Sequence, residues 1–258
     1  MANLPRFHCP SALHPGDALD LPAGTARHVQ VRRMQPNDAI TLFNGEGSEF
    51  KAVILRMGRS DVAVRVLEKV DVSRELSLRV NLWCGITANE RMDWLVEKAT
   101  ELGAVSLLPI SAERSVLKLK GERADKKLAH WQAIAVAASE QCGRNRVLQV
   151  ASPLSLPQAL AAETGESKAI KLRWVLSLSS GTQNLKDALK AFHPDAPGSP
   201  LEITSLEITL LSGPEGGLSP AEEAQALAAG FVPVSLGDRV LRAETAPVAV
   251  LSVLGALT

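Results

Sequence analysis

From residue 76 onward, the sequence alternates short apolar stretches with stretches of amphipathic spacing. The apolar stretches have strand length, and we expect strands at residues 76–86, 105–110, 147–150, 174–179, 206–211 and 231–236. Between them we expect one helix that ends at Gly103, and further helices at residues 124–142, 155–163, 185–192, 219–229 and 244–257. Strands that alternate with helices are typical of an α/β domain with a largely parallel sheet. The proline-rich stretch 193–200 is expected to be a loop.

The first 70 residues show a different pattern, with short strands separated by turn signals. Strands are expected at residues 28–31, 39–43, 49–55 and 62–66, and Asn44-Gly45 is a hairpin turn signal. No long amphipathic helix is expected here, which favours a small β-rich domain such as a barrel. We therefore expect an N-terminal β domain over residues 1–72 and an α/β domain over residues 73–258.

The charge of the chain is balanced overall but not locally. There are 28 basic and 28 acidic residues among 258, which excludes a polycationic protein that coats nucleic acid by bulk charge. Residues 110–148 carry a formal charge of +4, whereas residues 199–258 carry −5. A basic segment of this kind is compatible with binding an anion at one place, but the charge alone favours a solvated lysine face on one helix.

Composition narrows the class of protein further. No run of eighteen apolar residues is present, so we expect no membrane span, and the first twenty residues do not resemble a secretory signal. Cys9, Cys84 and Cys142 are few and far apart, which fits a reducing cytoplasm. No His or Cys pair has the spacing of metal ligands, so no metal site is expected. The absence of tyrosine argues against stacking of single-stranded bases as the main binding mode.

The segment 211–222, LSGPEGGLSPAE, is the most informative in the chain. Three glycines follow an expected strand, and then Ser219 as N-cap, Pro220 and Glu222 form a complete capping box. Ligands bind at the carboxyl ends of parallel strands, and glycines let the backbone approach them closely. The segment is neither a Walker A loop nor a G-x-G-x-x-G motif. It therefore favours a ligand held by backbone groups and small apolar contacts over a phosphate site.

The segment 235–246 also ends a strand, with a Leu-Gly turn followed by Arg239 and Arg242. The helix that follows is apolar on almost every side and must be buried, most simply under a second subunit. Upstream, Thr87 to Glu90 has capping-box spacing, with Asn89 as an alternative N-cap. The two arginines are candidates either for ion pairs at the edge of the core or for a functional site.

Five separated motifs identify a family. They are GPEGGLS at 213–219, LGDRVLRAETA at 236–246, RMDWLVEKATELGA at 91–104, ERSV at 113–116 and EQCGR at 140–144. In the same order, and over nearly the whole chain, they resemble the bacterial 16S rRNA uridine N3-methyltransferases of the RsmE type, in the SPOUT superfamily. The resemblance implies a trefoil-knotted α/β domain with a largely parallel sheet, preceded by a PUA-like β-barrel that helps to hold ribosomal RNA.

The resemblance also implies a cofactor and an assembly. S-adenosylmethionine would bind against three loops, the family acts as a homodimer, and the protein would work in the cytoplasm on the small ribosomal subunit. The residues expected to bind the cofactor are Leu178, Ser179, Ser212, Gly213, Pro214, Glu215, Gly216, Gly217, Leu236, Gly237, Arg239, Val240, Leu241 and Arg242.

Methylation at uracil N3 requires loss of the imide proton, and the charge that develops on the base needs a stabilising group. Arg242 is the first candidate for this group and Arg144 the second, whereas Glu140 and Glu244 are candidates for the proton acceptor. All four could instead form structural ion pairs. RNA phosphates are expected to contact Arg6, Arg32, Arg33 and Arg114.

Two other functions remain open from the sequence. One is a catalytically silent RNA-binding factor, although the intact glycine-rich and arginine-containing segments argue against it. The other is an α/β enzyme that acts on a small phosphorylated metabolite. Titration with S-adenosylmethionine distinguishes both from a methyltransferase.

Overall fold

A computed structural model describes residues 4–162, 170–190 and 206–257. The expected loop at 193–200 lies outside these residues. Contacts divide the chain into two units, the first comprising Met1–Glu75 with Val136–Val147 and the second Leu76–Ala135 with Leu148–Thr258. The segment 136–147 was not expected in the first unit, because it continues the pattern of one long helix and its contacts with the N-terminal residues leave no local signal in the sequence.

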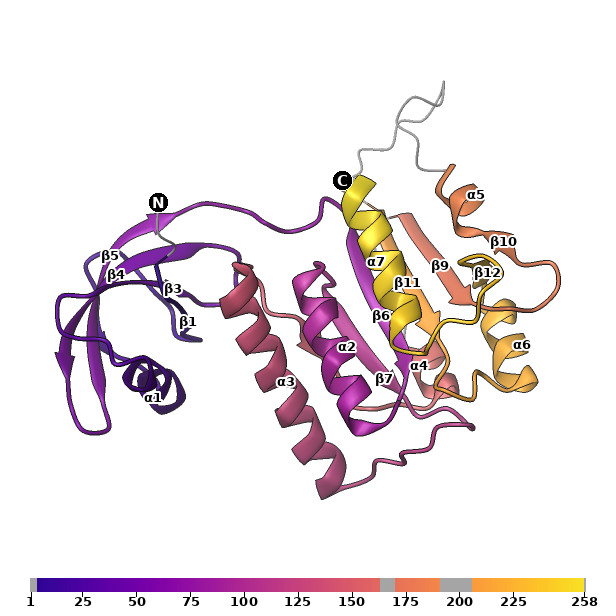
Figure 1. Cartoon of the computed structure of the whole chain (residues 1–258), viewed down its shortest axis with the longest axis horizontal. Coiled ribbons are helices and arrows are strands. Elements are labelled where there is room, and N and C mark those ends of the chain that lie inside the picture. The colour runs from indigo at the N-terminus through magenta and orange to yellow at the C-terminus, as the bar shows by residue number, and fades with distance from the viewer. Residues whose placement is uncertain (1–3, 163–169, 191–205, 258) are drawn as a thin grey trace. The chain divides into compact units, whose positions relative to one another are not determined.

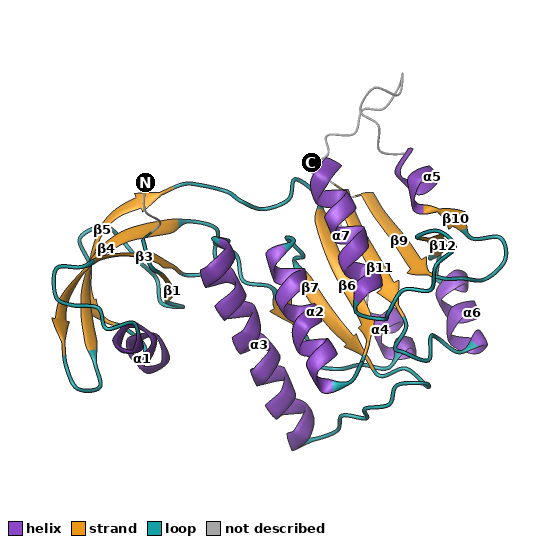
Figure 2. Cartoon of the chain, viewed as in Figure 1, coloured by secondary structure: helices purple, strands orange, loops and turns teal. Residues whose placement is uncertain are grey.

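The first unit is a five-stranded sheet with one helix (Figure 2). Its elements are β1 (Arg6–His8), β2 (Ala18–Asp20), α1 (Ala23–Val31), β3 (Ala39–Phe43), β4 (Glu49–Met57) and β5 (Val62–Val70). The strand order is β1-β3-β4-β5-β2. β1 pairs parallel with β3, whereas the other neighbours pair antiparallel. The hairpin signal at Asn44-Gly45 is confirmed, because these residues connect β3 to β4.

One expectation for this unit is wrong. Residues 28–31 form the last turn of α1 and not a strand. Their alternation of His, Val, Gln and Val resembles a strand, but the side chains that α1 buries are Ala26 and Val29, which lie three residues apart on one helical face. Burial of that face against the sheet overrides the weak helix propensity of the valines.

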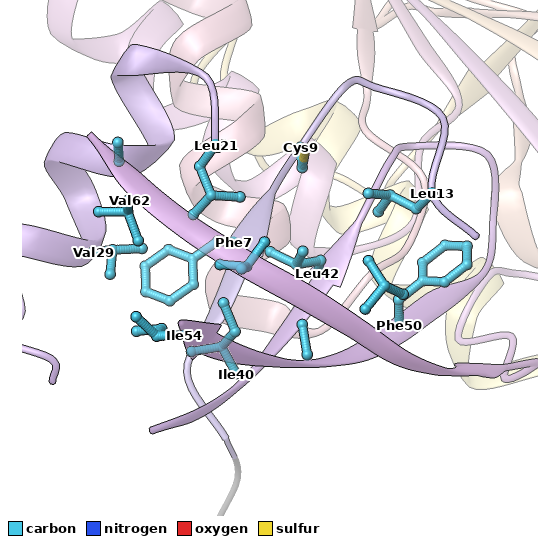
Figure 3. Packing of buried hydrophobic residues seen from close by; sticks show 14 of the residues in the cluster. Phe7, Cys9, Leu13, Leu21, Val29, Ile40, Leu42, Phe50, Ile54 and Val62 are labelled. Atoms are coloured by element: carbon cyan, nitrogen blue, oxygen red, sulfur yellow. The ribbon is translucent and has the colours of Figure 1, made fainter. Parts of the chain in front are cut away.

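The core of the first unit combines side chains from the sheet and the helix. Figure 3 shows Phe7, Leu42 and Ile54 from the strands beside Val29 of α1, and all four are fully buried. Along β4 and β5, buried residues alternate with more exposed ones, as expected for strands with one face on a core. This pattern explains why the sequence located both strands.

The second unit is built on a seven-stranded sheet (Figure 1). Its strands are β6 (Arg79–Gly85), β7 (Ser106–Ile110), β8 (Gln149–Val150), β9 (Ile170–Leu176), β10 (Gln183–Asn184), β11 (Leu206–Ser212) and β12 (Val232–Ser235). Their order is β10-β12-β9-β11-β6-β7-β8, and each neighbouring pair is parallel. The α/β class with a parallel sheet is therefore confirmed. β9 begins earlier and ends earlier than the expected strand at 174–179.

Helices lie on both faces of this sheet. The helices of this unit are α2 (Asn89–Glu101), α4 (Leu156–Ala162), α5 (Leu185–Lys190), α6 (Pro220–Ala228) and α7 (Thr245–Leu257). α3 (Glu122–Cys142) begins in this unit, and its residues from Val136 onward belong to the first unit. α2 and α7 pack together in front of β6 and β11 in Figure 1. On the other face, Leu156 and Ala159 of α4 and Ala226 of α6 share a buried cluster with Trp83 and Leu211 of the sheet. Among the described helices, none is long and apolar enough to cross a membrane.

The two expected helix caps have different outcomes. At α6 the capping box is confirmed, because the Ser219 side chain accepts from the Glu222 backbone and the Glu222 carboxylate accepts from the Ser219 backbone. At α2 the expected capping box is wrong, because the N-cap is Ala88, whose side chain cannot accept a hydrogen bond. Here the carboxylate of Glu215, from a distant loop, accepts from the backbone N–H of Ala88 at 3.0 Å. A tertiary contact thus replaces the local cap.

Candidate functional site

A pocket of about 340 Å³ lies where β9, β11 and β12 end. Three chain segments form its wall, one after each of these strands, and the first turn of α7 completes it. Because all strands of the sheet are parallel, their carboxyl ends meet at one edge, where ligands of α/β proteins bind. The residues that line the pocket are Leu176, Ser177, Leu178, Ser212, Gly213, Pro214, Glu215, Gly216, Gly217, Leu218, Val234, Ser235, Leu236, Arg239, Val240, Leu241, Ala243 and Ala246.

Around the loop after β11, backbone atoms lie so close together that two positions have room only for glycine. A Cβ added to Gly213 would lie 2.6 Å from the backbone nitrogen of Leu218. Gly217 has a φ of +70° and donates to the carbonyl of Pro214 at 2.8 Å, which closes the turn. From the end of β6, Gly85 approaches the same loop, and a Cβ there would lie 2.2 Å from the nitrogen of Pro214. The glycines therefore give this loop a compact shape.

Glu215 connects the glycine loop to α2. Its Oε1 accepts from the backbone of Ala88 at 3.0 Å and from Arg91 Nη1 at 3.2 Å. Arg91 Nε also lies 3.9 Å from Oε1 of Glu244, at the start of α7. The side chain of Glu244 is 10% exposed, and its Oε2 is buried without a hydrogen-bond partner among the described residues. Two carboxylates thus face one guanidinium.

The outer side of the glycine loop is held by the ERSV segment. The Arg114 guanidinium donates to the carbonyls of Gly216 and Leu218, at 3.1 and 3.3 Å. The backbone N–H of Glu113 donates to the Glu222 carboxylate at 2.9 Å. Glu222 therefore caps α6 and fixes the neighbouring chain at the same time.

A third carboxylate fixes the loop after β9. Glu223, in the first turn of α6, accepts hydrogen bonds from the hydroxyls of Ser177 and Ser179. The backbone N–H of Ser179 in turn donates to the Ser177 hydroxyl at 3.1 Å. Three of the acidic residues that make the C-terminal region negative are therefore structural, because Glu215 and Glu223 hold pocket-lining segments and Glu222 holds the chain next to them.

Most of the residues expected to bind the cofactor line the pocket, and their role as ligands stays a prediction. They are Leu178, Ser212, Gly213, Pro214, Glu215, Gly216, Gly217, Leu236, Arg239, Val240 and Leu241. Within the described chain, Ser179, Gly237 and Arg242 are neighbours of the lining and not part of it.

The sequence analysis missed several lining residues, namely Leu176, Ser177, Leu218, Val234, Ser235, Ala243 and Ala246. Leu176 and Ser177 were missed because the expected strand ended too late along the chain. Ala243 precedes α7 and Ala246 lies in its first turn, and nothing in the local sequence distinguishes them from other alanines of the chain. Gly85 gives no local signal, because its need for glycine comes from Pro214 in a distant segment.

The charged candidates of the second unit differ in exposure. Arg242 is exposed, and its carbonyl accepts from the backbone of Thr245 and Ala246 at 3.0 and 3.1 Å, where α7 begins. Arg239 lines the pocket and is also exposed. Both arginines therefore carry a solvent-facing guanidinium beside the pocket, whereas Glu244 is buried beneath it.

Glu140 and Arg144 belong to the first unit and have partners there. Glu140 accepts from the backbone of His8 at 2.9 Å and lies 3.0 Å from Nδ1 of His28. Burial raises the pKa of the Glu140 carboxyl above its ordinary value. Arg144 is 3% exposed and forms an ion pair with Glu75. Their catalytic roles stay predictions, and the contacts seen here are structural.

The arginines of the first unit that are expected to contact RNA differ in how exposed their side chains are. The guanidinium of Arg6 binds Glu49 at 2.5 Å and Asn145 at 2.6 Å, which leaves little of it accessible. Arg32 and Arg33 are exposed at the end of α1, and Arg32 lies over the Phe7 ring at 5.8 Å. No group of three or more His, Cys, Asp or Glu side chains that could hold a metal ion occurs in the part of the chain that the structure describes.

Family models match both units. Residues 74–255 match the RNA methyltransferase domain, and residues 21–67 match the RNA methyltransferase PUA domain. The chain is 35% identical over 225 residues to ribosomal RNA small subunit methyltransferase E of Bacillus subtilis. The match covers 87% of this chain and 84% of the relative. With the enzyme of the same name from Buchnera aphidicola (subspecies Schizaphis graminum), the identity is 27% and the match covers 97% of this chain and 95% of the relative.

Solved structures give the same result. A methyltransferase from Legionella pneumophila with bound S-adenosylmethionine has a TM-score of 0.86 and 34% identity, covering 99% of this chain and 98% of the other. Ribosomal RNA small subunit methyltransferase E from Neisseria gonorrhoeae, bound to the same cofactor, has a TM-score of 0.84 and 32% identity, with the same coverage.

Proposed function

Because the chain belongs to the ribosomal RNA small subunit methyltransferase E family, we propose that it methylates N3 of one uridine in 16S ribosomal RNA with S-adenosylmethionine. The observation that carries this proposal is the glycine-rich pocket at the carboxyl edge of the parallel sheet. Its walls come from the segments that the resemblance assigns to the cofactor.

The pocket suits S-adenosylmethionine in its chemistry. Its glycine loop offers backbone groups to a nucleoside, and Leu178, Val240 and Leu241 offer apolar surface for a flat base. No Walker-type phosphate loop is present in the sequence, and the cofactor carries no phosphate. The carboxylates of Glu215, Glu222 and Glu223 also make this region favourable for a cationic sulfonium. When bound, the cofactor supplies an electrophilic methyl group.

Arg242 is the residue that we propose to stabilise the base as it loses its N3 proton. Negative charge then spreads onto the uracil carbonyl oxygens, and a guanidinium placed beside them lowers the cost of that charge. Arg242 is exposed at the edge of the pocket, as a group that meets an incoming base must be. Glu244 is less suited to direct proton transfer, because its free oxygen is buried. Water, or Glu140 and Arg144 of the first unit, remain secondary proposals for these roles.

Replacement of Arg242 by alanine tests this assignment. We expect Arg242→Ala to lose methylation while binding of S-adenosylmethionine is retained, because Arg242 is not part of the pocket lining. Arg79→Ala serves as control, since Arg79 is exposed at the start of β6, at the other end of the strand from Gly85. Undiminished methylation by Arg242→Ala would remove this arginine from the mechanism.

We further propose that RNA binds through exposed arginines, chiefly Arg32 and Arg33, with Arg114 contributing from the second unit. Phosphate neutralisation releases counterions, so the affinity for RNA should fall as salt rises. Arg32→Gln and Arg33→Gln should each weaken RNA binding and reduce the salt dependence. Arg6 is a weaker candidate, because Glu49 and Asn145 engage its guanidinium. An affinity that is unchanged between low and moderate salt would contradict the proposal.

Assembly and location complete the proposal. We propose a homodimer, supported by exposed apolar side chains such as Val253 and Leu257 on α7. We also propose that the chain end is threaded as in the α/β knot of the family, and that the protein acts in the cytoplasm, where its sparse cysteines would stay reduced.

The decisive experiment uses small ribosomal subunits from a strain that lacks this activity. The purified protein and S-adenosylmethionine should add one methyl group to a uridine, and mass spectrometry of the nucleosides should identify N3-methyluridine. Parallel incubation with free 16S RNA shows which substrate is used. A protein that binds RNA but not S-adenosylmethionine would instead be a catalytically silent RNA-binding factor.

A further inference from the structure

Arg91 lies outside the pocket lining but joins two of its walls. Its Nη1 binds Glu215 of the glycine loop at 3.2 Å, and its Nε lies 3.9 Å from Glu244 at the start of α7. Glu215 lines the pocket, and Glu244 stands between Ala243 and Ala246, which both line it. The guanidinium of Arg91 on α2 therefore interacts both with the loop after β11 and with the segment before α7.

Arg91 places one positive charge beside the carboxylates of Glu215 and Glu244. Glu244 is buried, with a side chain that is 10% exposed, whereas the Glu215 side chain is 22% exposed and lines the pocket. Glu244 Oε2 has no hydrogen-bond partner among the described residues, and Arg91 is the cation placed at its other oxygen. A buried carboxylate that loses its cation is strongly unfavourable. Without Arg91, Glu244 would lose the cation at its Oε1, and Glu215 would lose its ion pair with α2.

We propose that Arg91 is a positioning residue that sets the affinity for S-adenosylmethionine by holding the glycine loop and the start of α7 together. This inference rests on the proposed function, since it concerns the same pocket. Arg91 acts through Glu215 and Glu244 and does not touch the bound molecule. The fork of the guanidinium suits this task, because two of its nitrogens serve two different carboxylates.

Replacement of Arg91 should weaken the binding of S-adenosylmethionine without changing the binding of RNA. Loss of Arg91 changes the pocket wall, so the Kd and the KM for S-adenosylmethionine should rise by about tenfold. A change of this size is within the range of coupling energies between residues that contact each other. The KM for RNA should stay unchanged. A residue that only stabilises the fold would lower the Tm without such a split. Arg91→Lys should recover part of the affinity, because its single ammonium keeps the charge but cannot bridge both carboxylates.

Calorimetric titration of the full-length protein with S-adenosylmethionine, without RNA, tests the proposal. The variants are Arg91→Ala, Arg91→Lys, Glu215→Gln and the double variant Arg91→Ala/Glu215→Gln, with Arg79→Ala as control. If Arg91 acts through Glu215, the double variant should lose less affinity than the two single losses combined. Arg79→Ala should bind within about twofold of the unmodified protein, as a surface change far from the pocket should.

Each result decides between the two proposals. Unmodified protein that fails to bind the cofactor overturns the proposed function. Unmodified protein that binds, together with a folded Arg91→Ala that binds within twofold of it, overturns only the role of Arg91. If Arg91→Ala does not fold, Arg91→Lys and Glu215→Gln decide, because both preserve the shape of the cluster. Normal cofactor binding by both would then refute the proposal.

Discussion

Gly85 and Gly213 are the residues where the backbone around the pocket has least room. Gly85 faces Pro214, and Gly213 faces the backbone of Gly217 and Leu218, in each case closer than a Cβ can approach. Backbone atoms cannot rotate out of the way as the end of a flexible side chain can. Any side chain at these positions must therefore move the loop that forms the pocket wall.

Gly85→Ala should weaken binding of S-adenosylmethionine by about tenfold or more, because overpacking forces the backbone to shift. Calorimetry measures the affinity, and thermal unfolding checks that the protein is folded. Gly24→Ala is the matched control, since a Cβ there has nothing within 4 Å and should leave binding unchanged. Normal affinity in Gly85→Ala would show that the loop can move without affecting the pocket.

His8 makes the first unit sensitive to pH. Burial lowers the pKa of His8 below its usual 6.5, although a backbone hydrogen bond at Asn44 acts in the opposite direction. Below pH 6.5 the unfolded chain therefore binds a proton that the folded protein does not, and stability falls as the pH falls.

A substitution can isolate this contribution. In His8→Asn, the decrease of Tm between pH 7 and about pH 5 should be smaller than in the unmodified protein, because the linked proton is gone. Equal slopes in the two proteins would mean that His8 does not contribute.

At the scale of elements, α6 illustrates how local and distant contacts combine. Ser219 and Glu222 cap the helix reciprocally, a pattern complete within four residues. The other oxygen of Glu222 accepts from the backbone of Glu113, which is 109 residues away in the chain. The start of α6 thus stabilises both itself and the segment that holds the glycine loop.

Removal of the two capping side chains should have unequal effects. Ser219→Ala should cost about 1 kcal/mol, as is usual for an N-cap. Glu222→Ala should cost more, about 2 kcal/mol, because it loses the cap and the hydrogen bond to Glu113. Glu122→Ala is the control, since the Glu122 side chain is exposed in the first turn of α3 and pairs with the exposed Lys126 at 2.8 Å. Urea unfolding measures all three, and a loss in Glu222→Ala no larger than in the control would contradict this account.

At the scale of the whole molecule, the chain divides into two units. The first matches an RNA methyltransferase PUA domain, and the second contains the pocket. The second unit also exposes apolar side chains, including Trp94 of α2 and Val253 and Leu257 of α7, two helices that contact each other. Exposed apolar side chains on two helices that contact each other support the proposed homodimer.

Val253→Glu should shift the protein from dimer to monomer, because the charge would be buried without a partner in the interface. Sedimentation should then give the mass of one 27.5 kDa chain in place of two. Leu227→Glu introduces the same charge at an exposed leucine of α6 and should leave the dimer intact. A dimeric Val253→Glu would place the interface elsewhere.

The sequence by itself determined the α/β class, the positions of most strands and helices, and the cap of α6. These features depend on periodicity and on neighbours along the chain, so a single sequence contains them. Residues 28–31 show where local patterns fail. They were expected to form a strand, but they belong to a helix that is stabilised by burial of Ala26 and Val29 in the core of the first unit.

Only the tertiary structure decided which charged groups meet. Arg91 and Glu215 are 124 residues apart, and the sequence does not reveal that one holds the other. The same holds for Gly85 opposite Pro214 and for Arg144, an expected catalytic residue whose partner is Glu75. Ion pairs and steric limits between distant segments depend on how the strands are ordered in the sheet, and no local pattern of residues encodes that order.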